Sequence, residues 1–553
     1  MRYSCLLGIL VMISAVSAQE SPKEILNRFR SAGMKGGDSA AGEKVFRSEK
    51  AGCTKCHTTG EKKRLAGPDL NVIGDKFDRN QLIKSVLEPS ARIHPDHATV
   101  SLVLKSGRVV NGVLKRRTDE SVELFDEQGN AQSVSVDDIE EQRGSKTSLM
   151  PAGLHKLMDE QQFADLIAWL ETKTQPDSDH PGIPSQISSA TKSAELKVFA
   201  DGFDHPVWLT PKPGEHGTWI VVEQKTCKAW QLKQSAGDLT RSVFVDMSSE
   251  SISGVYEGVM CLAFHPDFEK NGLYYLNHHV REEGVFSPVI VERQATEDRS
   301  RDSGRATRRL IRIKQETDLH WGGMLAFGPD NLLYIGAGDG GPQEDPDGHG
   351  QNTKTWQGKI LRIDVDGRTG DKAYGIPDSN PFVGRTDVLP EIWGLGFRMP
   401  WRFSWDNKTN EMWVGDIGQN LFEEVTIARK GGNHGWNVYE GFTHFSDRYR
   451  RQGDSYVPPV FSYRRRLGVS VTGGYVYRGT RNSSLTGCYI FGDFETKYIW
   501  ALRREPSGGV TVRRIAQCPQ KPCSFGIDHD GEVFVIGYQG TIYRLVVDGV
   551  QFP

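Results

Sequence analysis

The chain has almost no net charge, and it has no long hydrophobic run beyond its first residues. Its 68 Lys and Arg side chains against 71 Asp and Glu leave a formal charge of −3, too little for a broad field that would attract nucleic acid or an anionic membrane. The apolar run from Cys5 to Val16 is shorter than the roughly 20 residues that a membrane-spanning helix needs. These absences argue against a nucleic-acid-binding protein and against a membrane span.

Charge is locally concentrated in a few short basic clusters, such as Arg464-Arg465-Arg466. Clusters of this length are usually solvated charges on loops or strand edges. We therefore expect these arginines to lie at the surface and to form no binding patch.

The first residues have the pattern of an export signal. Arg2 provides positive charge, Cys5 to Val16 form the apolar segment, and Val16-Ser17-Ala18 supplies small residues for cleavage. No cysteine lies beside the cleavage point, which argues against a lipid anchor. We predict a signal peptide over 1–18 and a periplasmic or secreted protein.

A chain of 553 residues is too long for a single hydrophobic core, so several domains are expected. Residues 38–173 open and close with helical patterns and enclose a strand-rich insert at 100–136, which we interpret as a small β-meander without chemistry of its own. Residues 174–194 are polar and rich in proline, as expected of a linker. From 195 to 548 the chain is a succession of short strands and turns.

The strand-rich region repeats one unit: an apolar strand, a turn with Pro-Asp or Asp-Gly-like residues, an aromatic strand and a further strand. Six instances occur, and 195–548 divided by six gives about 59 residues each, which suits a four-stranded blade with one long loop. The predicted fold class is multidomain, with a mainly α cytochrome c domain followed by an all-β six-bladed propeller. Tandem β-sandwiches are the alternative, but they do not explain why the same strand-turn-strand unit recurs.

Cys53-Thr54-Lys55-Cys56-His57 forms a C-x-x-C-H motif. In such a motif two thiols form thioethers to a haem, and the adjacent imidazole ligates the iron from one face. Redox and zinc sites also use C-x-x-C, but here the motif follows an export signal and a helical segment. The sequence predicts covalent haem c.

The second axial ligand is predicted to be Met150, in the segment Ser148-Leu149-Met150-Pro151 just before a helix at 159–172. His94, His97 and His155 are the alternatives. A thioether ligand raises the haem potential relative to a second imidazole, which suits acceptance of electrons from an organic donor.

Few cysteines remain once Cys5 and the haem thiols are set aside, and their number is odd. Cys518 could pair with Cys523 and Cys227 with Cys261, which would leave Cys488 free. Burial as small hydrophobic side chains is an equal alternative.

His320 is the candidate base of the strand-rich region. It precedes Trp321-Gly322-Gly323, where two glycines would let a flat ligand approach the backbone. A near-neutral imidazole can take the proton of an alcohol or hemiacetal while the carbon delivers hydride, although a structural histidine is the commoner role. The acidic loop Gly338 to Asn352 offers oxygen ligands for calcium, or it is a tight turn with solvated acids; it is not an EF-hand.

Residues 38–173 resemble the haem-binding cytochrome domains of planctomycete-type multidomain proteins through three segments: GPDL at 67–70, LEPS at 87–90 and SLMPAGL at 148–154. The strand-rich region resembles the glucose/sorbosone dehydrogenase family, which includes aldose sugar dehydrogenases and hedgehog-interacting-type proteins. The matching segments are LAFHPDF at 262–268, GPDNLLYIGAGDGG at 328–341, GKILRIDVDG at 358–367, GFRMPWRFSWD at 396–406, GDIGQNLFEEV at 415–425 and GGNHGW at 431–436.

This second resemblance implies an enzyme that uses pyrroloquinoline quinone (PQQ), with calcium polarising its carbonyls. It implies that His320 is the base, that Arg398 pairs with the quinone oxygens, and that Gly418 and Gln419 offer carbonyls to calcium. Glu424 matches a structural calcium ligand.

The pattern has gaps. Met399 replaces the usual Asn, Lys521 and Cys523 occupy the positions of two arginines that clamp the PQQ carboxylates, and Glu495 lies near the expected lysine, with Lys497 two positions on. A pocket with fewer fixed cations should bind PQQ more weakly.

The sequence thus supports an exported sugar or alcohol dehydrogenase that passes electrons from PQQ to haem and on to a redox acceptor. The alternative is a non-catalytic propeller that binds a carbohydrate or a protein and carries an electron-transfer cytochrome domain.

Overall fold

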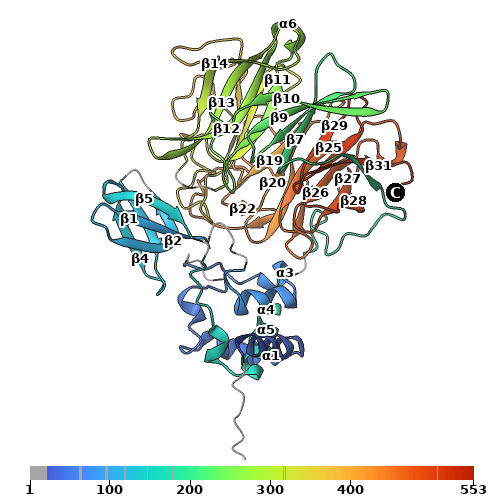
Figure 1. The fold of residues 1–553 in the computed structure, drawn as a ribbon. Helices are drawn as coiled ribbons and strands as arrows, with labels where there is room; N and C mark the ends of the chain where they lie inside the picture. The colour runs from blue at the N-terminus through green and yellow to red at the C-terminus, as the bar shows by residue number, and fades with distance from the viewer. Residues whose placement is uncertain are drawn as a thin grey trace, which may run out of the picture. The chain divides into compact units, whose positions relative to one another are not determined.

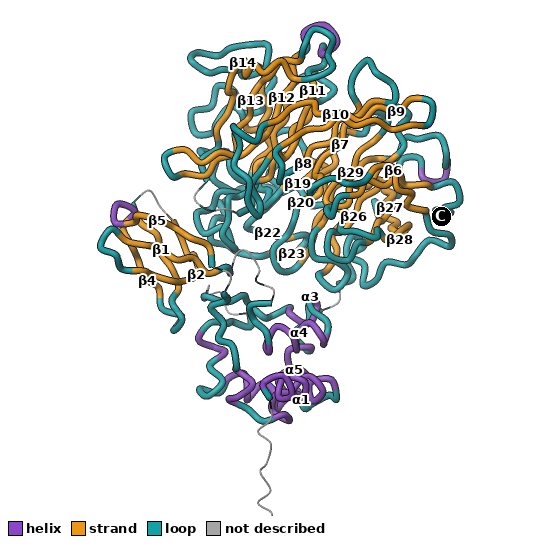
Figure 2. The backbone as a smooth tube through the Cα atoms, viewed as in Figure 1, coloured by secondary structure: helices purple, strands orange, loops and turns teal. Residues whose placement is uncertain are grey.

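The computed structural model describes residues 21–553 apart from 61–64, 92, 94–96, 118–119, 146, 177, 316, 318 and 507. The predicted signal peptide and His94 lie outside the described residues. The chain forms two compact units: Met1–Thr54, Phe77–Arg92 and Met150–Thr172 make up the first, and the remaining segments make up the second. Figure 2 separates the two kinds of structure, with helices in purple and strands in orange.

The first unit is helical. Its helices are α1 (Pro22–Met34), α2 (Ser39–Arg47), α4 (Arg79–Leu87) and α5 (Glu160–Glu171), with a short 3-10 turn at Leu154–Leu157. Helix α5 packs against α2: the rings of Phe46 and Trp169 lie 4.5 Å apart. Phe163, Leu166, Ile167 and Leu170 are buried along one side of α5.

Helix α1 lies ahead of the predicted domain start at residue 38. Its Ser21 accepts a hydrogen bond from the backbone of Glu24, whose side chain bonds back to the Ser21 N–H. This capping box, followed by Pro22 at the first helical position, is a helix-start signal in the sequence. Phe29 of α1 meets Phe163 of α5 edge to face at 5.5 Å, so the helix belongs to the core of this unit.

The strand-rich insert is a five-stranded antiparallel sheet of order β4-β3-β2-β1-β5. Its strands are β1 (Thr99–Leu104), β2 (Val109–Arg117), β3 (Ser121–Phe125), β4 (Ala131–Ser135) and β5 (Ile139–Gly144). The predicted meander is present as β1 to β4, and β5 returns to pair with β1, so the sheet extends beyond residue 136. Two short helical segments occur nearby in the chain: the 3-10 turn η1 (Cys53–Lys55) and α3 (Ile73–Lys76).

Six four-stranded antiparallel sheets hold the strands of the described chain after residue 194, apart from a two-stranded ribbon. Figure 1 traces their order by colour, from the green sheet with β7 to the red one with β31. The first sheet holds β7 (Pro206–Pro211), β8 (Thr218–Glu223), β9 (Lys228–Ser235) and β10 (Asp238–Asp246), and the second holds β11 (Val259–Phe264), β12 (Leu273–Glu282), β13 (Val285–Ala295) and β14 (Asp302–Arg312). The third holds β15 (Gly322–Phe327), β16 (Leu333–Ala337), β17 (Lys359–Ile363) and β18 (Ile392–Leu395), and the fourth holds β19 (Pro400–Trp405), β20 (Met412–Asp416), β21 (Phe422–Ala428) and β24 (Phe461–Arg464). The fifth holds β25 (Val471–Val476), β26 (Tyr489–Asp493), β27 (Tyr498–Arg504) and β28 (Val510–Gln517), and the sixth holds β29 (Pro522–Ile527), β30 (Val533–Gly537), β31 (Thr541–Val546) and β6 (Glu195–Ala200). The ribbon is β22 (Tyr439–Glu440) with β23 (Thr443–His444), and α6 (Phe268–Asn271) is a single turn.

The inner strands of these sheets contact one another in a closed cycle, β7, β11, β15, β19, β25, β29 and back to β7. The first strand of the region, β6, pairs with the last one, β31, and so joins the two ends of the ring. The sequence prediction of six blades is confirmed. The strands β8, β16 and β17 are buried on both faces, which explains their continuous apolar runs.

The two glycines after Trp321 are explained by packing. Gly323 has φ of 131°, and a Cβ there would lie 2.8 Å from the side chain of Met260; a Cβ on Gly322 would lie 2.7 Å from the carbonyl oxygen of Gly336. Gly323 thus lets β15 approach the neighbouring inner strand β11, and Gly322 lets it approach β16 of its own blade. The prediction that they admit a flat ligand is not needed to account for them.

The expectation of a solvated arginine cluster is wrong for two of its three residues. Arg464 and Arg465 are 1% and 4% exposed, whereas Arg466 lies at the surface. The seven described cysteines form no disulfide, so neither Cys518–Cys523 nor Cys227–Cys261 is paired here, and the five in the propeller are buried. Burial as small apolar side chains is the alternative that holds.

Among the described residues, no helix is long and apolar enough to cross a membrane.

Candidate active site

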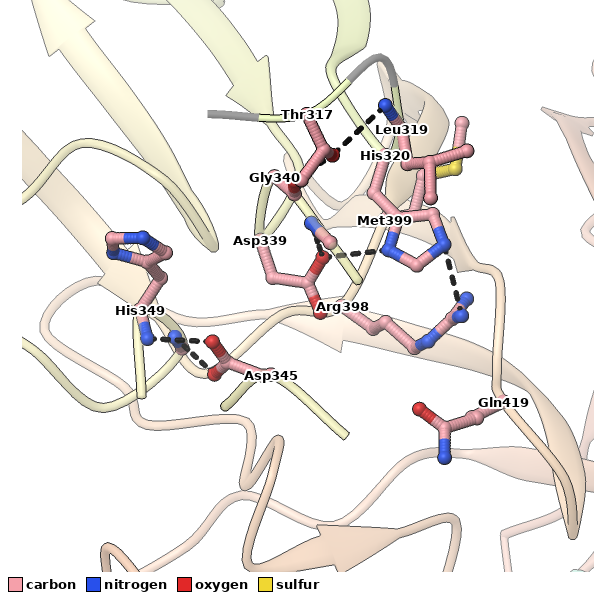
Figure 3. Close-up of polar contacts among 12 residues, drawn as sticks. Thr317, Leu319, His320, Asp339, Gly340, Asp345, His349, Arg398, Met399 and Gln419 are labelled. Carbon is pink, nitrogen blue, oxygen red and sulfur yellow. Dashed lines mark hydrogen bonds and ion pairs between the residues drawn. The ribbon is translucent and has the colours of Figure 1, made fainter. Parts of the chain in front are cut away.

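His320 and Asp339 form a buried pair at the start of the third blade (Figure 3). His320 lies just before β15, and its Nδ1 is 2.7 Å from Oδ1 of Asp339, which follows β16. The His320 side chain is 8% exposed and that of Asp339 is fully buried. The backbone of His320 has φ of 48°, a left-handed conformation that costs free energy and concentrates at functional sites.

Asp339 is also held by donors from two other segments. The Gly341 N–H donates to Oδ1 at 2.9 Å, and the indole N–H of Trp436 donates to Oδ2 at 2.8 Å. Burial alone would raise the pKa of Asp339, but the charge and hydrogen bond of His320, with Arg398, outweigh it and lower the pKa. An ionised Asp339 accepts the Nδ1 proton of His320, which leaves the lone pair of the imidazole on Nε2.

Arg398 lies on the other side of the imidazole. Its Nη2 is 3.0 Å from Nε2 of His320, and its Nη1 donates to the carbonyls of Ile417 at 3.2 Å and Gly418 at 3.0 Å. The guanidinium also lies 5.7 Å from the ring centre of Trp436. The structure therefore brings together the two predicted catalytic residues, which are 78 positions apart in the chain.

Asp416 fixes the backbone that carries Arg398. Its two oxygens accept the N–H groups of Arg398 at 3.1 Å and Met399 at 2.7 Å. Burial raises the pKa of Asp416 to about 7 against the effect of these bonds. Met399 contributes a backbone donor at the position where the related pattern has Asn.

The predicted calcium-binding segment at Gly418 and Gln419 is organised by Glu440. One oxygen of this fully buried carboxylate accepts the backbone N–H groups of Gln419, Asn420 and Leu421 at 2.6 to 2.9 Å, and its other oxygen has no hydrogen-bond partner within the described chain. The Gly418 carbonyl already accepts a bond from Arg398.

Glu424 lies close to the same segment and accepts a hydrogen bond from the Gly441 N–H. Burial, with the neighbouring charges of Asp416 and Glu440, raises its pKa well above the ordinary value. Within the described residues, no three His, Cys, Asp or Glu side chains are grouped as a metal site would need.

The acidic loop Gly338 to Asn352 is a tight turn. Asp345 accepts the N–H groups of His349 at 2.7 Å and Gly350 at 2.8 Å. The buried ammonium of Lys359 donates to the carbonyls of His349 and Gln357. Burial raises the pKa of Asp345 to about 8 and lowers that of Lys359 to about 7. These groups stabilise the loop from within, and Asp345, a buried acid rather than a solvated one, uses both of its oxygens on backbone N–H groups.

Neither position of the missing carboxylate clamp offers a free cation. Lys521 lies 3.0 Å from both carboxylate oxygens of Glu495, which neutralises its charge. Cys523 is buried and donates its thiol hydrogen to the carbonyl of Pro206 at 3.0 Å. At the two arginine positions, the gap seen in the sequence is therefore also a gap in the folded site.

The C-x-x-C-H motif is ordered by the loop that follows it. The Nδ1 of His57 lies 2.9 Å from the carbonyl of Pro68, and the Gly67 N–H donates to the carbonyl of Cys56 at 2.8 Å. A Cβ on Gly67 would lie 2.5 Å from Cε1 of His57, so only glycine fits there. Cys53 and Cys56 are half-buried thiols outside any disulfide, and Met150 is likewise partly buried.

Sequence reasoning missed three residues of the propeller site. The sequence suggests Asp339 only as one of the possible calcium ligands of the acidic loop. Its Gly-Asp-Gly-Gly segment does indicate a turn beside the end of a strand. Trp436 ends the matching segment GGNHGW, but the sequence assigns no role to it or to Glu440, because their contacts lie 97 and 21 positions away along the chain.

Comparison with known proteins places this site in a family. The chain is 30% identical to the HIPL1 protein of Arabidopsis thaliana over 387 residues, which are 55% of each chain. It is 26% identical to the aldose sugar dehydrogenase YliI of Escherichia coli over 267 residues, 47% of this chain and 68% of the relative. The chain spans little more than half the length of the first of these relatives.

The fold agrees with solved structures. The PQQ-bound aldose sugar dehydrogenase of Streptomyces coelicolor superposes with a TM-score of 0.50 and 19% identity, over 65% of this chain and 99% of that one. The family model for glucose / sorbosone dehydrogenase matches residues 203–544, which include all the propeller residues of the site. The chain belongs to the glucose/sorbosone dehydrogenase family.

Proposed function

We propose that the protein is an exported, PQQ-dependent sugar dehydrogenase whose electrons leave through a covalently bound haem c. The observation that carries the proposal is the contact of His320 with both Asp339 and Arg398, because it joins a base, its orienting carboxylate and a cation in one buried cluster. Family membership and the similarity to an aldose sugar dehydrogenase support the substrate class, an aldose or related alcohol.

His320 acts as the general base at Nε2. Asp339 holds Nδ1–H in place and stabilises the imidazolium that forms when Nε2 takes the hydroxyl proton of the sugar. Nε2 faces Arg398 in this structure, so the substrate hydroxyl must replace that contact. Arg398 remains beside His320 as a fixed positive charge, which would stabilise negative charge on the quinone oxygens of a bound acceptor.

PQQ, when bound, supplies the acceptor for hydride. Arg398 would hold it through the quinone oxygens, and this buried cation between the base and the Gly418 segment fits such a role. At the carboxylate end, Glu495 neutralises Lys521. We therefore expect PQQ to bind, but more weakly than in proteins with a complete clamp.

Calcium would be held by Gly418, Gln419 and Glu424, with Glu440 as an added ligand. The second oxygen of Glu440, buried and unbonded among the described residues, and the raised pKa of Glu424 both reflect buried negative charge that a cation would neutralise. Calcium supplies Lewis-acid polarisation of a carbonyl.

The haem would be attached to Cys53 and Cys56. The bond between His57 Nδ1–H and the Pro68 carbonyl leaves Nε2 available for iron, and burial lowers the pKa of His57, so the neutral ligand form is favoured. Met150 is the proposed second ligand. The haem supplies one-electron acceptance, and a downstream redox partner would collect the electrons.

Reconstitution tests the proposal. Purified protein is given PQQ and calcium, then aldoses, and haem reduction is followed by its absorption bands, with a dye acceptor in a parallel assay. The proposal predicts sugar-dependent reduction in both assays, lost in His320→Ala with the haem spectrum unchanged. Absence of PQQ binding and of any reduction would contradict it, whereas dye reduction without haem reduction would contradict only the relay.

Covalent haem is tested separately in Cys53→Ser and Cys56→Ser variants. We expect the double variant to lose all haem that survives denaturation, because no thioether can form. Haem staining of the denatured protein on a gel measures this. Cys518→Ser, a buried cysteine of the propeller, should keep full staining; equal staining of all variants would overturn the assignment.

Trp436→Phe removes one hydrogen bond from Asp339 and keeps an aromatic ring beside Arg398. We expect kcat/KM to fall by about 10- to 100-fold, the value of a bond to a charged group. Loss of this donor raises the pKa of Asp339, so the acid limb of the pH profile should move to higher pH. The pH dependence of the reconstituted enzyme measures this, and an unshifted profile would show that Trp436 only packs.

The alternative is a non-catalytic propeller that binds a carbohydrate or protein. The neutralised Lys521 favours it, because this lysine then cannot hold a PQQ carboxylate. The cluster of His320, Asp339 and Arg398 argues against it, since a purely structural role would not need a base beside a buried cation.

A further inference from the structure

Arg402 lies in the central channel of the propeller and contacts three other blades. It belongs to β19, the inner strand of the fourth blade. Its Nη2 donates to the carbonyls of Val207 in β7 at 2.6 Å and Met260 in β11 at 3.2 Å, and its Nη1 lies 3.9 Å from the sulfur of Met324 in β15. The side chain therefore extends from one inner strand across the channel to the others.

The charge of this guanidinium is not balanced by an acid. Arg402 is 2% exposed, and no carboxylate of the described residues lies within ion-pair distance of it. Other buried arginines do have such partners: Arg293 pairs with Asp302 and Arg362 pairs with Asp330. A buried charge without a counter-charge is costly, so proteins normally pair it.

One N–H donor of the guanidinium also has no hydrogen-bond acceptor among the described residues. The Nε of Arg402 is buried, and nothing in the described part of the chain accepts a hydrogen bond from it. Buried N–H groups nearly always have a partner, and an ionised donor has the greatest need of one.

The nearby thiols cannot supply the counter-charge. Cys261 and Cys523, from the second and sixth blades, lie near enough to interact with Arg402, as does the phenol of Tyr475 in the fifth. Burial raises the pKa of Cys261 to about 11 and that of Cys523 to about 12. Both are thus neutral thiols at physiological pH, and Cys523 already donates to the carbonyl of Pro206.

The surroundings set the size of a ligand. The rings of Trp401 and Trp208 lie 4.6 and 5.2 Å from the guanidinium carbon. Trp401 and Tyr475 are only partly buried, whereas the Nε of Arg402 is buried. A single cation between aromatic walls matches a small, singly charged anion, and it offers too few donors for sulfate or phosphate.

We propose that Arg402 is the centre of an anion-binding site in the propeller channel, and that it takes chloride or a similar small monovalent anion through its Nε–H. The bound anion neutralises the guanidinium and so stabilises the contacts that Arg402 makes with the first three blades. This role is independent of the proposed dehydrogenase activity, and the site lies apart from the contacts of His320.

Bromide tests the site directly. Crystals of the full-length protein grown or soaked in bromide should give an anomalous peak within hydrogen-bond distance of the Arg402 Nε. A water molecule at that position, or no peak there, would overturn the proposal.

Stability gives a second readout. At constant ionic strength, exchange of gluconate for chloride should raise the melting temperature of the wild-type protein by roughly 2–4 °C, because an anion that binds only the folded state stabilises it. Arg402→Met should lose this response. Arg362→Met, which removes a buried arginine that has an acidic partner, should lower the melting temperature but keep the response.

The proposal is contradicted if chloride leaves the melting temperature of the wild-type protein unchanged, or if it raises that of Arg402→Met by the same amount. If Arg402→Met does not fold, the bromide peak and the wild-type titration still decide it.

Discussion

Asp339→Asn is expected to lower kcat/KM of the reconstituted enzyme by about 10³- to 10⁴-fold. The new amide would keep the size of the side chain but would no longer be an anion that accepts the Nδ1 proton of His320 at 2.7 Å. Without that anion the imidazole loses its fixed tautomer and the stabilisation of its protonated form, which in comparable acid–base pairs is worth this factor. Sugar-dependent dye reduction measures the loss.

The control for this variant lies in the same loop. Asp347→Asn changes a partly buried acid that lies eight positions further along the same loop, so it should retain activity within a few-fold. The nitrogen chemical shifts of His320 provide an activity-independent readout, because they distinguish the Nδ1–H and Nε2–H tautomers. Unchanged shifts and near wild-type activity in Asp339→Asn would show that Asp339 does not orient the base.

Arg465→Met is expected to destabilise the propeller by about 3–5 kcal/mol. Arg465 donates to a carboxylate oxygen of Glu423, and these side chains are 3% and 0% exposed. Removal of the cation leaves Glu423 buried without its partner, which is far more costly than the net value of the pair. Thermal and urea unfolding of the protein measure the change.

The size of this effect should depend on pH. Burial raises the pKa of Glu423 to about 7 from an ordinary value of 4.5. The folded state therefore binds a proton more tightly than the unfolded state, so stability falls as the pH rises from about 4.5 through 7. Arg465 lowers this pKa, and its removal should make the loss larger at about pH 8 than at about pH 5.

Two further variants check this explanation. Arg466→Met removes the neighbouring arginine, whose side chain is 31% exposed, and should have little effect. Glu423→Gln combined with Arg465→Met should recover part of the lost stability, since neither charge of the pair remains. A destabilisation of Arg465→Met that is the same at both pH values would contradict the proposed cause.

The sequence predicted the propeller well because blade formation depends on local pattern. Each blade is built from strands that are mostly adjacent in the chain, and their turns carry Pro-Asp, Asp-Gly or similar residues. Helix α5 was predicted for the same reason, since Phe163, Leu166, Ile167 and Leu170 follow helical spacing. Helix α1 could have been predicted from the Ser21 and Glu24 capping box, which is also a local signal.

The site was predicted only in part. His320 was a candidate from its own segment and Arg398 only through resemblance to a family, but nothing in the sequence said that their side chains meet. Trp436 is 97 positions from Asp339, and Glu440, which lies on the ribbon strand β22, is 21 positions from Gln419. Such contacts depend on how separate blades and loops pack, and no short-range pattern encodes them.

The same limit explains the incorrect expectation for the Arg464 to Arg466 cluster. A run of arginines has no apolar period, so the sequence indicates a surface. In the folded chain β24 packs beside β21, and Glu423 on β21 provides a buried acid for Arg465. The positive charge of Arg465 can be buried only because the pairing of β21 with β24 places the carboxylate of Glu423 beside it.

By itself, then, the sequence determined the C-x-x-C-H motif at Cys53, Cys56 and His57, the six blades after residue 194, and the candidate base. These depend on spacing and local periodicity, which short segments carry. The tertiary structure alone decided that Asp339, Trp436 and Arg398 surround the reactive end of the site, that the cysteines of the propeller stay out of disulfides, and that Arg402 lies across the channel. Those outcomes depend on which distant side chains share a buried volume, because burial sets the charge state and the hydrogen-bond partners of each group.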